Sequence, residues 1–260
     1  MIEYKNSPPH TMPRKGSGAV IVLLKKRTVL LIFVGMLLIF AGIAALLPQR
    51  DKPAAAASVL PAQTVLILDA GHGGEDGGAV SASGVPESTI NLQITQKLDM
   101  LFAFTGETTL LTRTGESAIY SDSAQTLREK KVSDLNNRVK LVNETGQSFL
   151  ISIHQNSLPG TRVRGAQVFY NTVDPAQSTA VSVQQALNGS INRNNEKNAK
   201  QIDDSIFLMN KIQRPGILVE CGYLSNAGEA ELLQSESHQL RLSAAIASGY
   251  LQSRTEIKQP

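Results

Sequence analysis

Short apolar runs alternate with longer stretches of helical periodicity over most of the chain. Residues 64–69 are β-branched and aliphatic side chains followed by turn-forming residues, a pattern that predicts a buried strand. Within residues 88–104, Ile90, Ile94 and Leu98 recur at the spacing of one helical face. By the same criteria we predict strands at 108–112, 149–153, 163–170 and 217–219, and helices at 132–144 and 175–192. Residues 227–252 are predicted to form one or two closing helices, residues 114–131 a polar loop with a helical turn, and residues 194–205 a polar connection. The alternation of strands and helices predicts an α/β fold with helices on both faces of one sheet.

A continuous apolar segment precedes this pattern. Residues 28–47 carry no charge and are long enough to cross a bilayer as a helix, and Lys25, Lys26 and Arg27 come directly before them. Positive charge on that side predicts an amino terminus inside the cytoplasm and a body outside it. Two interpretations stay open: an uncleaved membrane anchor, which the length favours, and a signal segment cleaved near Ala57.

The segments of the chain differ in charge. We expect a basic cytoplasmic tail at 1–27, the apolar segment at 28–47, an Ala/Pro-rich linker at 48–63, an α/β domain at 64–252 and a short tail at 253–260. Eight of the 25 basic residues lie before residue 53, and the rest of the chain holds 17 basic and 20 acidic residues. Because the chain also has no tryptophan and no basic–aromatic cluster, nucleic acid is not an expected partner.

The candidate chemistry lies where predicted strands end. The first strand runs into Asp69-Ala-Gly-His72-Gly-Gly, and α/β proteins bind ligands at the carboxyl ends of their strands. An imidazole held in such a turn can bind a metal or act as a general base. On a later predicted strand, Ser152, His154 and Asn156 share one face by alternation.

Two carboxylates complete the candidate site. Glu87 lies in the loop before a predicted helix, which Ser88 is expected to cap, and Glu220 ends the last predicted strand. Two imidazoles and one carboxylate form a zinc site of the catalytic type with one position left for water, and a further carboxylate can take a proton from that water. The predicted zinc ligands are His72, Glu87 and His154, and the predicted base is Glu220.

These motifs, in this order, resemble the zinc-dependent N-acetylmuramoyl-L-alanine amidases of the amidase-3 family. The resemblance runs from about residue 65 to residue 251 and rests on D-A-G-H-G-G-x-D-x-G, G-x-x-E, S-I-H-x-N and E-x-G-Y-L-S-N. It implies a twisted, mostly parallel sheet, zinc on the predicted ligands, and Glu220 as the catalytic glutamate. The implied reaction is hydrolysis of the amide between the lactyl group of N-acetylmuramic acid and L-alanine of the peptidoglycan stem peptide.

Within the family, the chain is most similar to the germination-specific amidases of the spore cortex. This similarity rests on residues 128–138, on residues 165–170 and on the amino-terminal apolar segment ahead of a lone catalytic domain. It implies a role in cortex maturation, through muramic-lactam formation, and in germination. It also implies a location in the forespore envelope and an accessory lipoprotein or deacetylase as a partner.

Other polar residues have roles that stay open. Asp69 either orients His72 through its second nitrogen or caps the glycine turn. Asn156 either hydrogen-bonds the substrate or pins its loop. Arg128 lies in a charged run that is typical of a solvated face, and it is a candidate contact for an acidic stem peptide.

Two other functions remain for the same residues. One is a non-catalytic peptidoglycan-binding protein on the same fold, which the presence of all the polar site residues argues against. The other is a zinc peptidase that cuts stem peptides, which activity on stem peptide without muramic acid would favour.

Overall fold

A computed structural model of the protein describes residues 64–257 apart from residues 159 and 161. The predicted segments at 1–27, 28–47 and 48–63 therefore lie outside the described residues. Within the part that the structure describes, no helix is long and apolar enough to cross a membrane.

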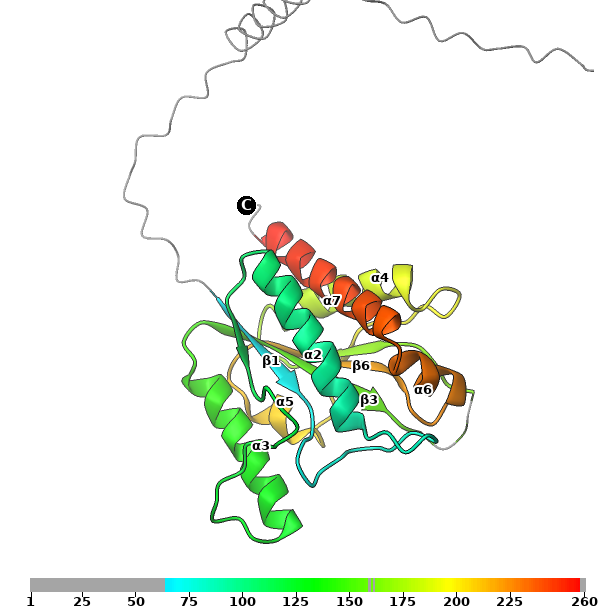
Figure 1. The fold of residues 1–260 in the computed structure, drawn as a ribbon. Helices are drawn as coiled ribbons and strands as arrows, with labels where there is room; N and C mark the ends of the chain where they lie inside the picture. Colours follow the sequence, from blue (N-terminus) through cyan, green and yellow to red (C-terminus); the bar gives the residue numbers. More distant parts are fainter. Residues whose placement is uncertain (1–63, 159, 161, 258–260) are drawn as a thin grey trace, which may run out of the picture. The chain divides into compact units, whose positions relative to one another are not determined.

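Within the described residues, six strands form one sheet in the order β2-β1-β3-β6-β4-β5 (Figure 1). The strands are β1 (Val65–Ala70), β2 (Thr109–Leu111), β3 (Ser148–Asn156), β4 (Gln167–Tyr170), β5 (Lys200–Gln201) and β6 (Gly216–Tyr223). Strands β2, β1, β3 and β6 run parallel, whereas β4 pairs antiparallel with β6 and parallel with β5. The prediction of an α/β fold with one mostly parallel sheet is confirmed.

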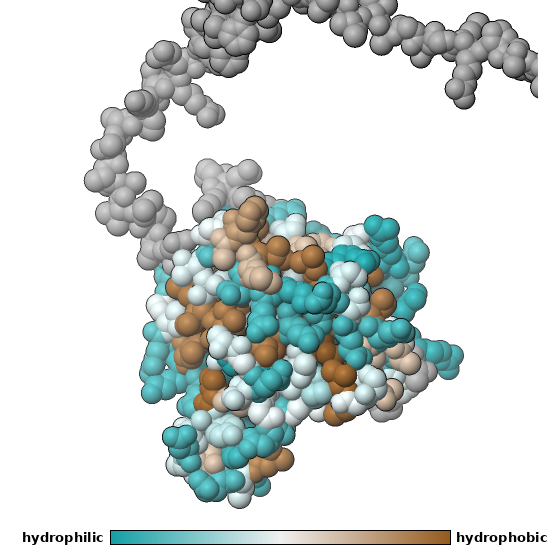
Figure 2. Space-filling model, viewed as in Figure 1, coloured by the Kyte–Doolittle hydropathy of each residue, from teal (hydrophilic) through white to brown (hydrophobic). Residues whose placement is uncertain are grey.

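Helices pack on both faces of this sheet. They are α2 (Glu87–Phe104), α3 (Leu127–Glu144), α4 (Ala176–Ser190), α5 (Phe207–Lys211), α6 (Ala227–Leu233) and α7 (Glu236–Ile257). Alternation sends Ile151 and Val219 to the face that α2, α4, α6 and α7 cover, and Leu150 and Leu218 to the face that α3 and α5 cover. Figure 1 shows α2 and α7 side by side over the sheet, and Figure 2 shows that side of the molecule as mostly hydrophilic with scattered hydrophobic positions.

Several predicted boundaries are wrong. The helix predicted from residue 132 starts earlier, because α3 already begins at Leu127 and includes the end of the segment for which a loop with a helical turn was predicted. A capping box starts this helix: the Thr126 hydroxyl accepts from the Glu129 amide, and the Glu129 carboxylate accepts from the Thr126 amide. Helix α7 runs to Ile257, so the first part of the predicted tail belongs to the closing helix. The short helix α5 has no counterpart in the prediction.

A buried ion pair joins α3 to the end of β1. Arg138 is 1% exposed, and its guanidinium forms ion pairs with Asp69 and Asp134. It also donates to the backbone carbonyls of Ala70 and His72, at 2.9 and 2.8 Å. The helix thereby holds the first residues of the loop that follows β1.

The carboxylate of Asp69 is fully paired. The hydroxyls of Ser152 and Thr112 donate to it at 2.6 and 2.8 Å. Burial alone would raise the pKa of Asp69, but the charge of Arg138 and the hydrogen bond from Ser152 hold it below its ordinary value. Asp69 is therefore an anion that is enclosed by its partners.

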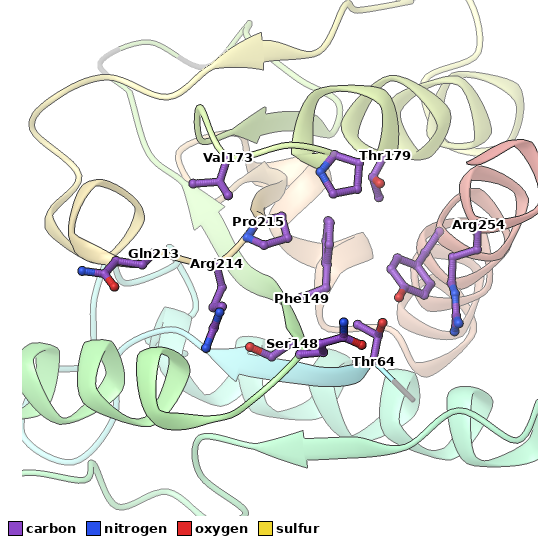
Figure 3. A pocket seen from close by; sticks show the side chains of 12 residues that line it. Thr64, Ser148, Phe149, Val173, Thr179, Gln213, Arg214, Pro215 and Arg254 are labelled. Carbon is purple, nitrogen blue, oxygen red and sulfur yellow. The ribbon is translucent and has the colours of Figure 1, made fainter. Parts of the chain in front are cut away.

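A cavity of about 460 Å³ lies at the amino-terminal ends of the parallel strands (Figure 3). Thr64 precedes β1, Ser148 begins β3 and Pro215 precedes β6, and all three line it together with Arg254 of α7. It contains none of the predicted site residues. The candidate chemistry belongs to the opposite end of the sheet.

Removing the buried guanidinium should destabilise the domain strongly. Arg138→Met should lower the free energy of unfolding by about 3–5 kcal/mol, because Asp69 and Asp134 would stay buried without their cation. Denaturant unfolding of the purified protein measures this loss. Lys140→Met on the same helix is the control, since Lys140 forms an exposed ion pair with Glu144 and its loss should change stability by at most about 1 kcal/mol. Similar small losses for both variants would contradict a structural role for the buried pair.

Candidate metal centre

Glu87 is the first residue of α2, which differs from its predicted place in the preceding loop. The predicted cap by Ser88 is also wrong, because Pro86 holds the N-cap position without a side-chain hydrogen bond. The amides of Glu87 and Ser88 donate to the carbonyls of Ala79 and Gly77, at 2.7 and 3.0 Å. Carbonyl groups of the glycine-rich loop thus accept the hydrogen bonds of the first amides of the helix. The Glu87 carboxylate lies close to the positive end of the helix.

The carboxylate of Glu87 brings the two predicted histidines together. Its Oε1 atom lies 2.9 Å from His154 Nδ1 and 3.4 Å from His72 Nε2. The two imidazole rings are 5.0 Å apart between centroids and inclined by 73°. One ligand atom from each of the three residues lies within 4.8 Å of the others. Two imidazole nitrogens and one carboxylate oxygen are a donor set that suits zinc.

Burial and mutual contact set the charges of this cluster. Burial opposes ionisation of Glu87, but hydrogen bonds to His154 and His72 keep its pKa well below the ordinary value. Burial also opposes protonation of His72, yet the hydrogen bond and charge of Glu87, with Asp76 behind, raise the pKa of His72 to about 9. The Glu87 carboxylate is therefore an anion between the two imidazoles, which is the form in which it can bind a metal ion.

Two glycines leave room for the side chains of the metal cluster. A Cβ atom on Gly71 would come within 2.2 Å of His154 Nε2, and one on Gly78 would come within 2.6 Å of Glu87 Oε2. His72 itself has a φ of 62°, in the left-handed region that favours glycine. The glycine-rich sequence after β1 is therefore required both by the turn and by the side chains that it surrounds.

Two residues that the sequence analysis missed hold Glu87 in place. The Asn91 amide donates to Glu87 Oε1 at 3.3 Å and to the Gly71 carbonyl at 3.1 Å. The backbone amide of Gln155 donates to the same carboxylate oxygen at 3.0 Å. Asn91 follows Glu87 by four residues, so it would have been recognisable once Glu87 was placed on a helix. The contact of Gln155 comes from the tertiary fold and has no local signal.

The residue that orients His72 is Asp76. Its Oδ2 atom lies 3.0 Å from His72 Nδ1. Asp69, which the sequence offered for this role or for a turn cap, instead faces Arg138 inside the domain. The motif after β1 contains both aspartates, and only the direction of the turn decides which of them reaches the imidazole.

Glu220 lies on β6 directly beside His154 of β3 in the register of the sheet. Burial raises the pKa of Glu220 to about 7; the charge of His154 opposes this rise and that of Glu87 adds to it. The Oε2 atom of Glu220 is buried and accepts no hydrogen bond from the described residues. The structure thus places a second carboxylate next to the cluster with one oxygen free of protein partners.

The other two candidate residues, Asn156 and Arg128, lie at the end of β3 and at the start of α3. A register irregularity separates Asn156 from His154 on β3, and the Asn156 carbonyl accepts from the Leu224 amide at 2.8 Å. Arg128 is exposed on the first turn of α3. A contact of either side chain with substrate stays a prediction.

A single methyl group at Gly71 should abolish metal binding. Gly71→Ala would place its Cβ within 2.2 Å of the His154 ring, so the ring must move away from Glu87. We expect zinc, measured by elemental analysis after gel filtration, to fall from about one equivalent per chain to a small fraction of it. Gly146→Ala is the matched control because its Cβ would meet no atom within 4 Å. Full zinc content in Gly71→Ala would show that His154 is not a ligand in this orientation.

Comparisons with known proteins agree on one family. A family model described as N-acetylmuramoyl-L-alanine amidase (Amidase_3) matches residues 66–252. The germination-specific N-acetylmuramoyl-L-alanine amidase of Bacillus subtilis is 32% identical over 197 residues, which cover 75% of this chain and 82% of that protein.

Solved structures agree with this result. The CwlD amidase from Clostridioides difficile, solved in complex with the GerS lipoprotein, is similar with a TM-score of 0.71 at 33% identity over 75% of this chain and 100% of that chain. The amidase AmiC2 of Nostoc punctiforme is similar with a TM-score of 0.62 at 25% identity over 74% of this chain and 97% of that chain.

The matched region includes every residue of the metal cluster and Glu220. The family is zinc-dependent, and the two imidazoles and one carboxylate of the cluster suit that metal. The chain therefore belongs to the amidase-3 family of zinc-dependent N-acetylmuramoyl-L-alanine amidases.

Proposed function

We propose that this amidase cleaves the bond between the lactyl group of N-acetylmuramic acid and L-alanine in the peptidoglycan of the spore cortex. The observation that carries the proposal is the position of Glu220 beside the cluster of His72, Glu87 and His154. One carboxylate lies within the metal cluster, and the other lies next to it with a buried oxygen that accepts no hydrogen bond from residues 64–257 as far as the structure describes them. This division suits metal-assisted hydrolysis of an amide, in which one carboxylate holds the metal and another carries the proton.

The two glutamates have different tasks in this reaction. Glu87 would hold the zinc together with His72 and His154. Zinc bound there would polarise the amide carbonyl and lower the pKa of a water molecule. Glu220 accepts the proton of the attacking water and passes it to the alanine nitrogen as the carbon–nitrogen bond breaks. The products are a lactyl carboxylate on the sugar and a free amino terminus on the stem peptide.

The environment of Glu220 suits both halves of this proton transfer. Burial raises its pKa to about 7, so neither the protonated nor the ionised form is strongly favoured near neutral pH. Its place beside His154 in the sheet brings it to the cluster without making it part of the closest set of ligand atoms.

The cortex role rests on similarity to the germination-specific amidase of Bacillus subtilis. The related CwlD amidase from Clostridioides difficile was solved in complex with a lipoprotein. We propose by analogy that an accessory lipoprotein also binds this amidase in cortex maturation and germination. A deacetylase partner stays a prediction.

The proposed location of the enzyme rests on its amino-terminal sequence. Residues 28–47, with the basic residues before them, support a membrane anchor that leaves the catalytic domain outside the cytoplasm. A place in the forespore envelope depends on the cortex role. Cleavage near Ala57 is the alternative, and the size of the protein in the membrane fraction of sporulating cells distinguishes the two.

Mass spectrometry of digested peptidoglycan tests the proposed bond and both carboxylates together. The wild-type protein should release stem peptides with a free L-alanine amino terminus, and a zinc chelator should stop the release. Glu220→Gln should slow product release by at least about 10²-fold and keep its zinc, because the substitution removes only the proton carrier. Glu87→Gln should lose zinc and activity together, because a neutral amide is a poor zinc ligand.

Other outcomes of this experiment have definite meanings. A zinc-free Glu220→Gln variant, or an inactive Glu87→Gln variant with full zinc, would reverse the two roles. Cuts only within the stem peptide would favour a zinc peptidase. Binding to peptidoglycan without any cut, at full zinc occupancy, would favour a wall-binding protein.

A further inference from the structure

The two histidines of the metal cluster differ in what holds their second ring nitrogen. His72 presents Nε2 to Glu87, and its Nδ1 atom lies 3.0 Å from Asp76 Oδ2. His154 presents Nδ1 to Glu87, and its Nε2 atom faces Gly71 with no hydrogen-bond partner among the described residues. Both imidazoles thus contact Glu87, and His72 has a further carboxylate at its second ring nitrogen.

That carboxylate has a cation behind it. The Nζ atom of Lys131 lies 3.1 Å from Asp76 Oδ1, and the Gly78 amide lies 3.4 Å from the same oxygen. Asp76 is three-quarters buried, whereas Lys131 lies half exposed near the beginning of α3. A chain of contacts thus leads from the surface of α3 through Asp76 to the imidazole of His72.

A second ion pair joins the loop after β1 to the same turn of α3. Lys130 forms an ion pair with Glu75, and the Tyr120 hydroxyl donates to Glu75 at 3.3 Å. Within the loop, the backbones of Gly73 and Asp76 exchange hydrogen bonds of 2.9 and 3.1 Å. Asp76 is consequently held by Lys131 and the Gly78 amide at its side chain and by Gly73 at its backbone.

We propose that Asp76 and Lys131 are positioning residues that set the zinc affinity of this amidase. Asp76 accepts a hydrogen bond from Nδ1–H of His72, which leaves Nε2 without a proton and directed at the metal. Lys131 keeps the Asp76 carboxylate in that orientation. The charged residues near the start of α3, which the sequence marks as a solvated face, then have a function in the metal centre. This role rests on the metal ligands of the proposed function and not on its substrate.

Zinc affinity of the full chain, measured by competition with a chromophoric chelator, tests the proposal. Asp76→Ala should weaken zinc binding by about 10–100-fold, as loss of the partner of a metal-bound histidine does elsewhere. Asp76→Asn should recover part of that loss, because its amide oxygen can still accept from Nδ1–H. Lys131→Met should weaken binding by about 2–5-fold, in keeping with a half-exposed ion pair.

A double mutant shows whether Lys131 affects zinc affinity through Asp76 or through a general effect of its charge. In the Asp76→Ala background, Lys131→Met should have no further effect, since Lys131 acts only through Asp76. Lys140→Met, on an exposed stretch of the same helix, should leave zinc affinity unchanged. Melting temperatures in the presence of chelator identify any variant that has lost its fold, and Asp76→Asn and Lys131→Met then carry the test.

Long-range ¹H–¹⁵N spectra of the zinc-loaded chain show which ring nitrogen of His72 carries the proton. His72 should carry its proton on Nδ1 and bind zinc through Nε2. A proton on Nε2, wild-type zinc affinity in Asp76→Ala, or an undiminished effect of Lys131→Met in the double mutant would each overturn the proposal. Because no readout involves substrate, these outcomes are independent of whether the muramoyl–alanine bond is the one cleaved.

Discussion

The metal centre depends on a guanidinium that the domain buries completely. Arg138 brings its charge into the core, where Asp69 and Asp134 neutralise it and the carbonyls of Ala70 and His72 use its remaining donors. An uncompensated charge at this depth would cost several kcal/mol, so the loop after β1 is bound to this geometry as long as the domain is folded. The backbone of His72 is consequently fixed before any metal arrives.

A second arginine extends this control to the other side of the loop. Arg113 follows β2 and donates to the carbonyls of Ala70, Gly71 and Ser88, at 2.9, 3.2 and 2.7 Å. It thereby connects the end of β1 to the first turn of α2, which carries Glu87. Two cations that touch no metal ligand side chain thus determine where an imidazole and a carboxylate meet.

The sequence predicts the parts of the site that depend on local pattern. His72 follows a strand and enters a glycine turn, and alternation places His154 on β3. Glu220 lies within β6, which runs on to Tyr223, past the predicted end of that strand at residue 219. The α/β architecture follows from the same periodicity. The start of α2 cannot be predicted in this way, because loop carbonyls accept the hydrogen bonds of its first amides and no side-chain cap marks it.

Long-range contacts account for the rest of the disagreement. Charged residues on an amphipathic helix are usually solvated, and nothing local distinguishes buried Arg138 from exposed Lys140. Asp69 and Asp76 both flank the glycine turn, and the buried cation decides which of them is taken into the core. The remaining aspartate is left to reach His72.

The central claim is that a loop fixed by Arg138 presents three residues from separate elements to one metal ion. The most direct test is a crystal structure of the zinc-loaded protein with anomalous differences collected at the zinc absorption edge. The account predicts one strong peak in contact with His72 Nε2, Glu87 Oε1 and His154 Nδ1, with Glu220 outside the coordinating atoms. A peak bound by Glu220 in place of Glu87, or by Asp76, would contradict it.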